Sequence, residues 1–206
     1  LAARTDIPWR EAADHFQAQA AQDTAVELSG ALKALAVALV KIANDLRWLS
    51  SGPRCGLGEI NLPALQPGSS IMPGKVNPVI PEMLIQVAAQ VVGNDATITL
   101  AGTGGNFELN VMLPVIAFNL LQSIDLLGNA CRVAAADCIR DISANPEKCA
   151  AYIEQSLALV TGLVPHIGYD RAAELAYKAY RSGRTVREVA QEARILDEKT
   201  LSDILD

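Results

Sequence analysis

A heptad repeat of large aliphatic residues constrains the fold of this chain more than any other feature. Leucine or isoleucine recurs at spacings of four and three, and the positions are Leu28, Leu32, Leu35, Leu39, Ile42, Leu46 and Leu49. This spacing places the side chains along one face of an α-helix of about six turns. Alanine and valine fill much of the remaining circumference. The pattern therefore predicts a bundle helix that is packed on several sides.

The long segment that follows is almost free of charge. Only six of the sixty residues from 78 to 137 are Asp, Glu, Lys or Arg. A glycine-rich stretch at 102–105 interrupts it, so we expect one helix over about 78–100, with Asn77 as its N-cap, and another over 109–142. Helices this apolar need partners on most sides. We therefore predict an all-α fold, a long-helix bundle that further sequence or other copies of the chain complete.

The composition changes after residue 142. Residues 146–206 contain 18 charged residues in 61, which is typical of helices with one face in solvent. We predict two domains: residues 1–142 form part of a central helical bundle, and residues 143–206 form a small helical C-terminal domain. Thr185 is expected to cap a helix of the second domain.

Charge, hydropathy and cysteine content argue against several classes of function. The formal net charge is −6 and no basic run is present, which disfavours a nucleic-acid partner and an anionic membrane surface. The longest uncharged stretch, 109–124, is too short and too polar for a transmembrane helix. The four cysteines form no CxxC pair, and only two histidines are present. We therefore expect reduced thiols in a cytoplasmic protein, without a metal site or a cofactor.

A segment rich in proline and glycine, residues 51–80, separates the first predicted helix from the second. Long connections of this kind are usually functional or disordered, and the apolar residues within this one favour an ordered, functional loop. Its most polar part, residues 66–78, we call the serine loop. Residues 68–78 read GSSIMPGKVNP.

The serine loop contains the groups that a carboxylate-binding site needs. Gly68 and Gly74 allow tight turns that expose backbone N–H groups. Lys75 supplies a positive charge, Asn77 offers an amide, and the N-terminus of the following helix adds positive potential. A phosphate-binding loop is excluded, because the spacing of the glycines differs and Val76 follows the lysine.

The sequence GSSIMPGKVNP resembles the signature of the fumarase/aspartase superfamily at every position. Other segments resemble class II fumarases, and they are residues 52–60, 93–95, 105–111 and 166–170. Gly74 and the segment 105–110 favour fumarases over aspartases. The resemblance implies a lyase that hydrates fumarate reversibly to L-malate in the tricarboxylic acid cycle, through an aci-carboxylate intermediate. An aspartate ammonia-lyase and a non-enzymatic structural member of the superfamily stay open as alternatives.

The resemblance also implies roles for individual residues. Ser69 would be the base that removes the proton next to the substrate carboxylate. Glu82 would pair with an active-site histidine that lies outside this sequence. The residues that would bind the carboxylates of the small dicarboxylate substrate are Ser70, Lys75, Asn77 and, through its backbone, Val76.

Superfamily members are homotetramers, and each of their active sites combines residues from three subunits. They are about twice as long as this chain, which resembles their C-terminal half. The resemblance therefore implies that the 206 residues are not active alone. Glu108, in the apolar region, is expected either to cap a helix or to form a salt bridge between subunits.

Overall fold

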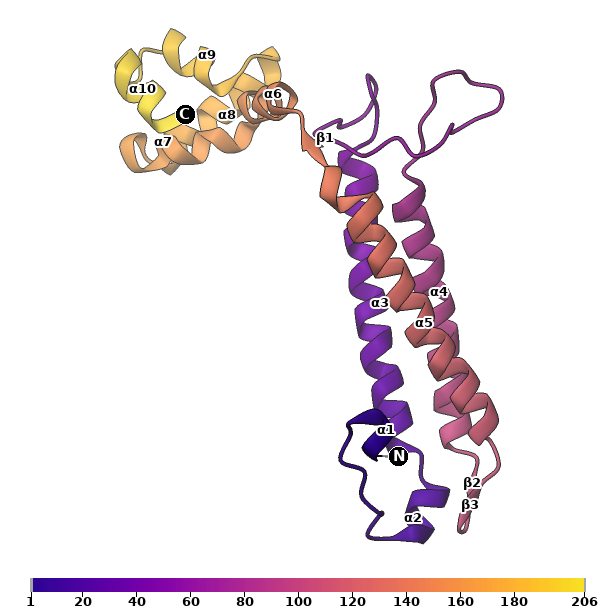
Figure 1. The fold of residues 1–206 in the computed structure, drawn as a ribbon. Helices are drawn as coiled ribbons and strands as arrows, with labels where there is room; N and C mark the ends of the chain where they lie inside the picture. Colours follow the sequence, from indigo (N-terminus) through magenta and orange to yellow (C-terminus); the bar gives the residue numbers. More distant parts are fainter. Residues whose placement is uncertain (1, 206) are drawn as a thin grey trace. The chain divides into compact units, whose positions relative to one another are not determined.

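The computed structural model describes residues 2–205 and divides the chain into two compact units, Leu1–Ser143 (unit 1) and Ala144–Asp206 (unit 2). Both units are built from helices (Figure 1). The predicted all-α fold is therefore confirmed. The predicted division into a bundle domain, 1–142, and a C-terminal domain, 143–206, stays a prediction.

Three long helices run side by side in unit 1 (Figure 1), and they are α3 (Asp23–Leu49), α4 (Val79–Gly102) and α5 (Leu113–Asp137). The chain reverses between α3 and α4 through a long loop. It reverses again between α4 and α5 through a hairpin of β2 (Gly105–Asn106) and β3 (Leu109–Asn110), which are antiparallel. The serine loop therefore lies at one end of the bundle and the hairpin at the other.

Short elements complete unit 1, and they are α1 (Ala2–Thr5), α2 (His15–Ala20), β1 (Ile60–Asn61) and the 3-10 helix η1 (Ile139–Asp141). Strand β4 (Ser143–Ala144) spans the boundary between the units. Helix α2 lies against β3 at the hairpin end. Strand β1 pairs with β4, and the Asn61 amide donates to the Ser143 hydroxyl over 3.3 Å. The chain just before the serine loop is thus tied to the segment that follows α5.

The buried face of α3 differs from its heptad face. The most deeply buried residues of α3 are Ser29, Ala36 and Ala43. The heptad residues that remain exposed are Leu28, Leu35 and Ile42. The small side chains allow α4 and α5 to approach α3 closely, and each of the buried alanines belongs to a cluster with residues of both helices. Three of the seven heptad residues therefore point away from this chain's own core.

The predicted bounds of the next two helices need correction. Asn77 does not cap α4: the N-cap is Pro78, without a side-chain hydrogen bond, because the Asn77 amide donates to the carbonyl of Gly68 instead. Helix α5 begins at Leu113 rather than at residue 109, because the preceding residues form the hairpin. Glu108 lies in that hairpin and does not cap a helix.

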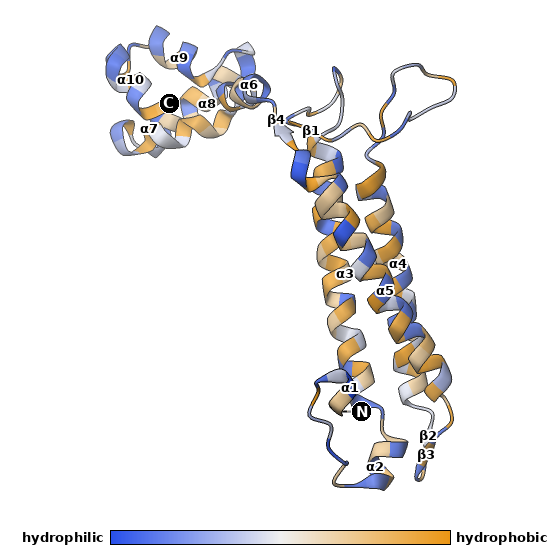
Figure 2. Cartoon of the chain, viewed as in Figure 1, coloured by the Kyte–Doolittle hydropathy of each residue, from blue (hydrophilic) through white to orange (hydrophobic). Residues whose placement is uncertain are grey.

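Helix α5 is also more apolar than its uncharged stretch indicated. The segment Leu113–Asp141 is long and apolar enough to cross a membrane by length and composition, a test that core helices also pass. The length of the uncharged stretch 109–124 was therefore not sufficient to exclude a helix of membrane-spanning length and composition. Figure 2 shows hydrophobic residues on the outward faces of the three long helices as well as between them.

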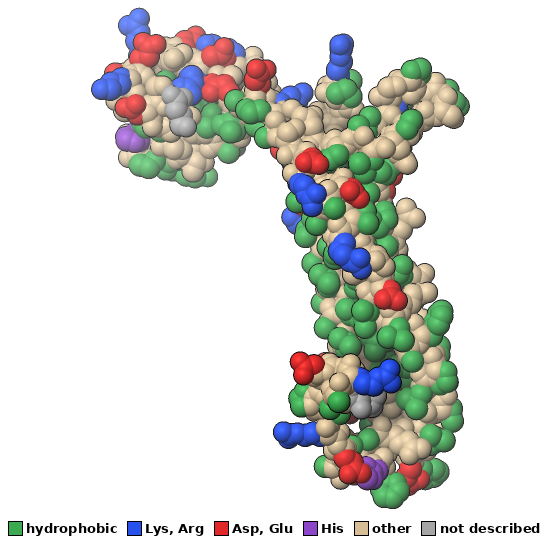
Figure 3. Space-filling view, viewed as in Figure 1, with side chains coloured by type: hydrophobic (Ala, Val, Ile, Leu, Met, Phe, Trp, Pro, Cys, Tyr) green, Lys and Arg blue, Asp and Glu red, His purple; other side chains and the backbone are tan. Residues whose placement is uncertain are grey.

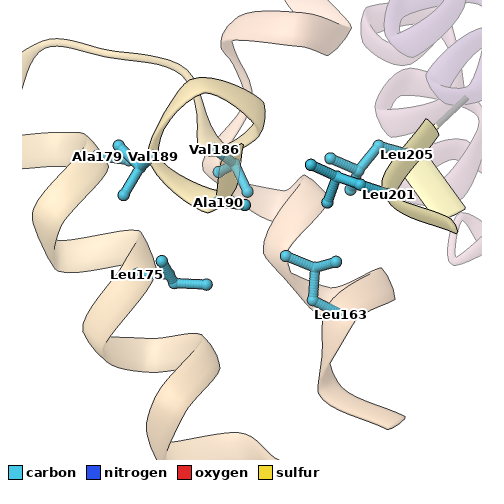
Figure 4. Packing of buried hydrophobic residues seen from close by; sticks show 8 residues of the cluster. All are labelled: Leu163, Leu175, Ala179, Val186, Val189, Ala190, Leu201 and Leu205. Carbon is cyan, nitrogen blue, oxygen red and sulfur yellow. The ribbon is translucent and has the colours of Figure 1, made fainter. Parts of the chain in front are cut away.

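Unit 2 consists of short helices, and they are α6 (Pro146–Gln155), the 3-10 helix η2 (Leu157–Leu159), α7 (Val160–Ile167), α8 (Tyr169–Ser182), α9 (Val186–Glu192) and α10 (Glu198–Leu205). Leucine, valine and alanine side chains from α7, α8, α9 and α10 converge in one core (Figure 4). The predicted cap of α9 is confirmed. The backbone N–H of Glu188 donates to the Thr185 hydroxyl, and the backbone N–H of Thr185 donates to the Glu188 carboxylate.

Candidate functional site

The serine loop is closed at its base by two hydrogen bonds. The backbone N–H of Gly68 donates to the carbonyl of Lys75 over 2.7 Å, and the Asn77 side chain donates to the carbonyl of Gly68 over 3.0 Å. The residues between them form a turn that projects from the end of the bundle (Figure 1). Closure thus brings the two stems of the loop together directly before the first turn of α4.

The backbone geometry of the serine loop favours glycine at both of its glycine positions. A Cβ on Gly68 would lie 2.7 Å from the carbonyl oxygen of Lys75 and 3.0 Å from the backbone nitrogen of Asn77. Real side chains do not tolerate such contacts with backbone atoms, so the closed loop requires glycine there. Gly74 has a φ of 76°, in the left-handed region that glycine adopts without strain.

Ser69 lies inside the turn, with two donors directed at its hydroxyl oxygen. The backbone N–H groups of Ile71 and Met72 donate to Oγ over 3.1 and 3.0 Å. Hydrogen bonds of this kind stabilise negative charge on the oxygen that accepts them. The two donors lie two and three residues after Ser69, which is the pattern of a local serine turn.

Of the other predicted residues, Lys75 donates its backbone N–H to the carbonyl of Met72 over 3.3 Å. Lys75 is exposed, and its ammonium group forms no ion pair within residues 2–205. Ser70 and Val76 are also exposed. Glu82 is half-buried in the first turn of α4, where its backbone N–H donates to the carbonyl of Pro78. The described chain therefore joins Ser69, Lys75 and Asn77 in one loop, in which Ser70, Lys75 and Val76 are exposed.

Sequence reasoning missed a buried ion pair in the bundle. Asp95 on α4 is 5% exposed and accepts hydrogen bonds from the Ser29 hydroxyl (2.8 Å) and the Lys33 ammonium group (2.5 Å) on α3. Burial raises the pKa of Asp95, but the two hydrogen bonds and the charge of Lys33 outweigh it and hold the pKa below its ordinary value. The signal was an aspartate isolated within an apolar helix.

A second polar group follows directly on α4. The Asn94 side chain, 2% exposed, donates to Ser123 and Gln122 of α5, each over 3.0 Å, and accepts from Gln90. Asn94 links α4 to α5, while Asp95 links α4 to α3. These bonds fix the register of the three helices, on which the position of the serine loop depends.

Two family models match the chain. One, described as lyase, matches residues 1–93, and the other, described as the C-terminus of fumarase C, matches residues 159–206. A class II fumarate hydratase of Thermosynechococcus vestitus is 57% identical over 192 residues, which are 93% of this chain and 41% of that protein. An aspartate ammonia-lyase of Pseudomonas aeruginosa is 53% identical over 205 residues, 100% of this chain and 43% of that protein.

A solved structure agrees with these sequence matches. The crystal structure of a fumarate lyase:delta crystallin from Brucella melitensis superimposes with a TM-score of 0.94 at 51% identity, and it covers 100% of this chain and 44% of that one. The chain therefore spans less than half the length of the curated relatives that it matches.

Proposed function

The chain belongs to the fumarase/aspartase superfamily of lyases, and we propose that it provides the serine loop of a class II fumarate hydratase. The reaction is the reversible addition of water to fumarate, which gives L-malate. One observation carries the proposal: the Ser69 hydroxyl accepts two backbone N–H groups within a closed loop. Such a loop prepares a serine to act as a base.

Ser69 acts, in the direction of malate dehydration, on the carbon next to a carboxylate. The alkoxide takes a proton from that carbon, and the electron pair of the broken C–H bond moves into the carboxylate. The resulting aci-carboxylate carries two negative charges on its oxygens. Lys75 and the N-terminus of α4 stabilise this charge more strongly than they stabilise the ground state.

Substrate binding is shared among neighbouring residues of the loop. We assign Ser70, Lys75 and the backbone of Val76 to the substrate carboxylates, since all three residues are exposed on the projecting turn. Asn77 has one N–H engaged with Gly68, so its second N–H is the group assigned to the substrate. Glu82 is assigned to orient a histidine that this chain does not contribute.

An open serine loop is not a complete active site. We therefore propose that the 206 residues have no turnover alone, and that the active protein is a homotetramer in which several subunits complete each site. The exposed aliphatic residues along α3 support such an assembly. A cytoplasmic location stays a prediction, which cell fractionation tests.

An aspartate ammonia-lyase is the second candidate, because a protein of that name is 53% identical to this chain. It would use the same base to remove the same kind of proton, with ammonia instead of water as the leaving group. The serine loop itself does not distinguish the two reactions.

The decisive assay follows fumarate consumption by the intact protein through ultraviolet absorbance, with and without ammonium. A hydratase consumes fumarate without ammonium, and an aspartase consumes it only with ammonium. Ser69→Ala should lower turnover at least ~100-fold, whereas the control Ser182→Ala, in unit 2, should retain it. Normal turnover of Ser69→Ala would refute the assigned base. No consumption by the wild-type protein under either condition would favour a structural member of the superfamily.

A further inference from the structure

A groove of about 660 Å³ lies on the surface of unit 2, between α7 and α8. Aliphatic residues of both helices line it, among them Val164 of α7 and Ala176 of α8. Leu163 and Leu175 of the same helices turn into the core of unit 2 instead (Figure 4). The volume of the groove is within the range of about 300–1,000 Å³ that is typical of small-molecule sites.

The lining of the groove is uncharged, since none of the described residues that form it is Asp, Glu, Lys or Arg. The charged residues of α8 lie outside the lining and have both signs, and they are Asp170, Arg171, Glu174, Lys178 and Arg181. Figure 3 shows charged side chains over much of unit 2 and hydrophobic side chains gathered on the side where α7 lies. An ion without a partner of opposite charge is costly to move from water into apolar surroundings. The groove therefore favours an uncharged occupant over a dicarboxylate such as fumarate.

Two tyrosines of α8 line the groove, and their rings are accessible to a ligand. Tyr169 is 76% exposed and Tyr177 is 66% exposed. They are eight residues apart, which is about 12 Å along the helix axis. Aromatic rings attract one another in stacked and edge-to-face arrangements. A flat ring placed between the two tyrosines would also contact Ala173 and Ala176, which line the groove from the same helix.

A proline within α7 gives the groove a hydrogen-bond acceptor. Pro165 lies inside this helix and has no N–H. In an α-helix the N–H of residue 165 would donate to the carbonyl of Thr161, so this carbonyl lacks its helical donor. Thr161 is exposed, and both Thr161 and Pro165 line the groove. An N–H or O–H group of a ligand can supply the missing hydrogen bond, and a few such polar groups orient ligands in apolar sites.

We propose that this groove binds a planar, uncharged aromatic molecule that carries an N–H or O–H donor. The ring lies along Ala173 and Ala176, between the two tyrosines, and the donor bonds to the carbonyl of Thr161. All of these residues belong to unit 2. The inference therefore does not depend on the reaction that is proposed for the serine loop in unit 1.

Titration of the intact protein with indole, followed by ligand-detected NMR, tests the site. Ala176→Leu places a larger side chain in the groove and should raise the dissociation constant of indole at least about tenfold. The control Ala151→Leu makes the same change at an exposed position of α6 and should leave that constant unchanged. No binding of indole to the wild type, or equal effects of the two substitutions, would overturn the site. Displacement of indole by fumarate would overturn the assignment to uncharged ligands.

A second probe tests the hydrogen bond to Thr161. N-methylindole has the same ring system without the N–H, so the wild type should bind it about fivefold more weakly than indole. Pro165→Ala introduces a backbone N–H that donates to the carbonyl of Thr161, and this variant should bind the two probes equally. Equal binding of the probes by the wild type would overturn the role of the donor. A preference for indole that persists in Pro165→Ala would overturn the Thr161 carbonyl as its acceptor.

Discussion

Replacing Asp95 by alanine is expected to destabilise unit 1 by about 2–4 kcal/mol. The wild-type carboxylate is 5% exposed and accepts hydrogen bonds from Ser29 and Lys33. Removing it leaves the Ser29 hydroxyl, in a residue that is 3% exposed, without its partner. Removing it also separates Lys33 from the only carboxylate with which it pairs in the described chain.

Two contributions set the magnitude. Loss of the partner of a buried polar group costs about 1–3 kcal/mol, and removal of one member of a fully buried ion pair costs about 3–5 kcal/mol. The Lys33 side chain is 45% exposed, so water solvates its ammonium group once Asp95 is gone. The ion-pair contribution is therefore smaller than in a fully buried pair.

Urea unfolding followed by tryptophan fluorescence measures this change selectively, because both tryptophans, Trp9 and Trp48, belong to unit 1. The matched control is Asp45→Ala, which removes a surface ion pair with Lys41 on α3 and should cost about 0–0.5 kcal/mol. An Asp95→Ala protein as stable as the control would refute the account of the bundle core.

The same comparison has a pH dependence of known sign. The pKa of Asp95 is lowered in the folded chain, so its stabilisation is fully present above the ordinary carboxyl pKa of about 3.9. The stabilisation is lost as the pH falls through the lowered folded pKa. The difference in unfolding free energy between the wild type and Asp95→Ala should therefore shrink in strong acid, and a difference that grows there would contradict this assignment.

Three further substitutions test separate parts of the chain. Gly68→Ala should lower turnover of the intact protein ~100-fold by displacing the loop. The control Gly93→Ala, with no atom within 4 Å of its added Cβ, should retain turnover and stabilise α4 by about 0.5–1 kcal/mol. Equal turnover of the two variants would refute the role of loop closure. Leu163→Ala, at a fully buried position of unit 2, should cost about 2–5 kcal/mol. Since all four tyrosines lie in unit 2, tyrosine absorbance should report this loss while tryptophan fluorescence does not, and a shared transition would contradict independent folding. Thr185→Ala should cost unit 2 about 0.5–2 kcal/mol through the lost cap, and an unchanged tyrosine transition would show that the capping box contributes nothing.

Local patterns predicted the helical elements, because helical periodicity, glycine and proline act over a few residues. They did not predict which face of α3 is buried. The large side chains form the more regular repeat, but small residues such as Ala36 occupy the closest contacts. Which stripe faces inward depends on the shapes of helices that lie far away in the sequence, and no local pattern contains that information.

The serine loop shows the same limit at the scale of single hydrogen bonds. Its motif identified Ser69, but the donors from Ile71 and Met72 depend on backbone dihedral angles that composition does not specify. Asn77 was expected to cap α4, since asparagine before a helix is a common N-cap. The Gly68 carbonyl competes for the same side chain, and loop closure decides the outcome in its favour.

The exposed apolar surface of α5 is expected to pack against other molecules. The polar residues of α5 indicate whether these are lipid or protein. Asn119 and Ser123 are buried, and Ser123 accepts a hydrogen bond from Asn94 of α4. Asp125 and Arg132 are exposed on the outer surface of α5. In a lipid bilayer each of these charges would cost about 2.5–3.5 kcal/mol near the centre. Within an assembly of helices, Asp125 and Arg132 can contact water or opposite charges. The aliphatic residues of α5 are then buried against neighbouring helices. We therefore infer that the outer face of α5 packs against protein rather than lipid.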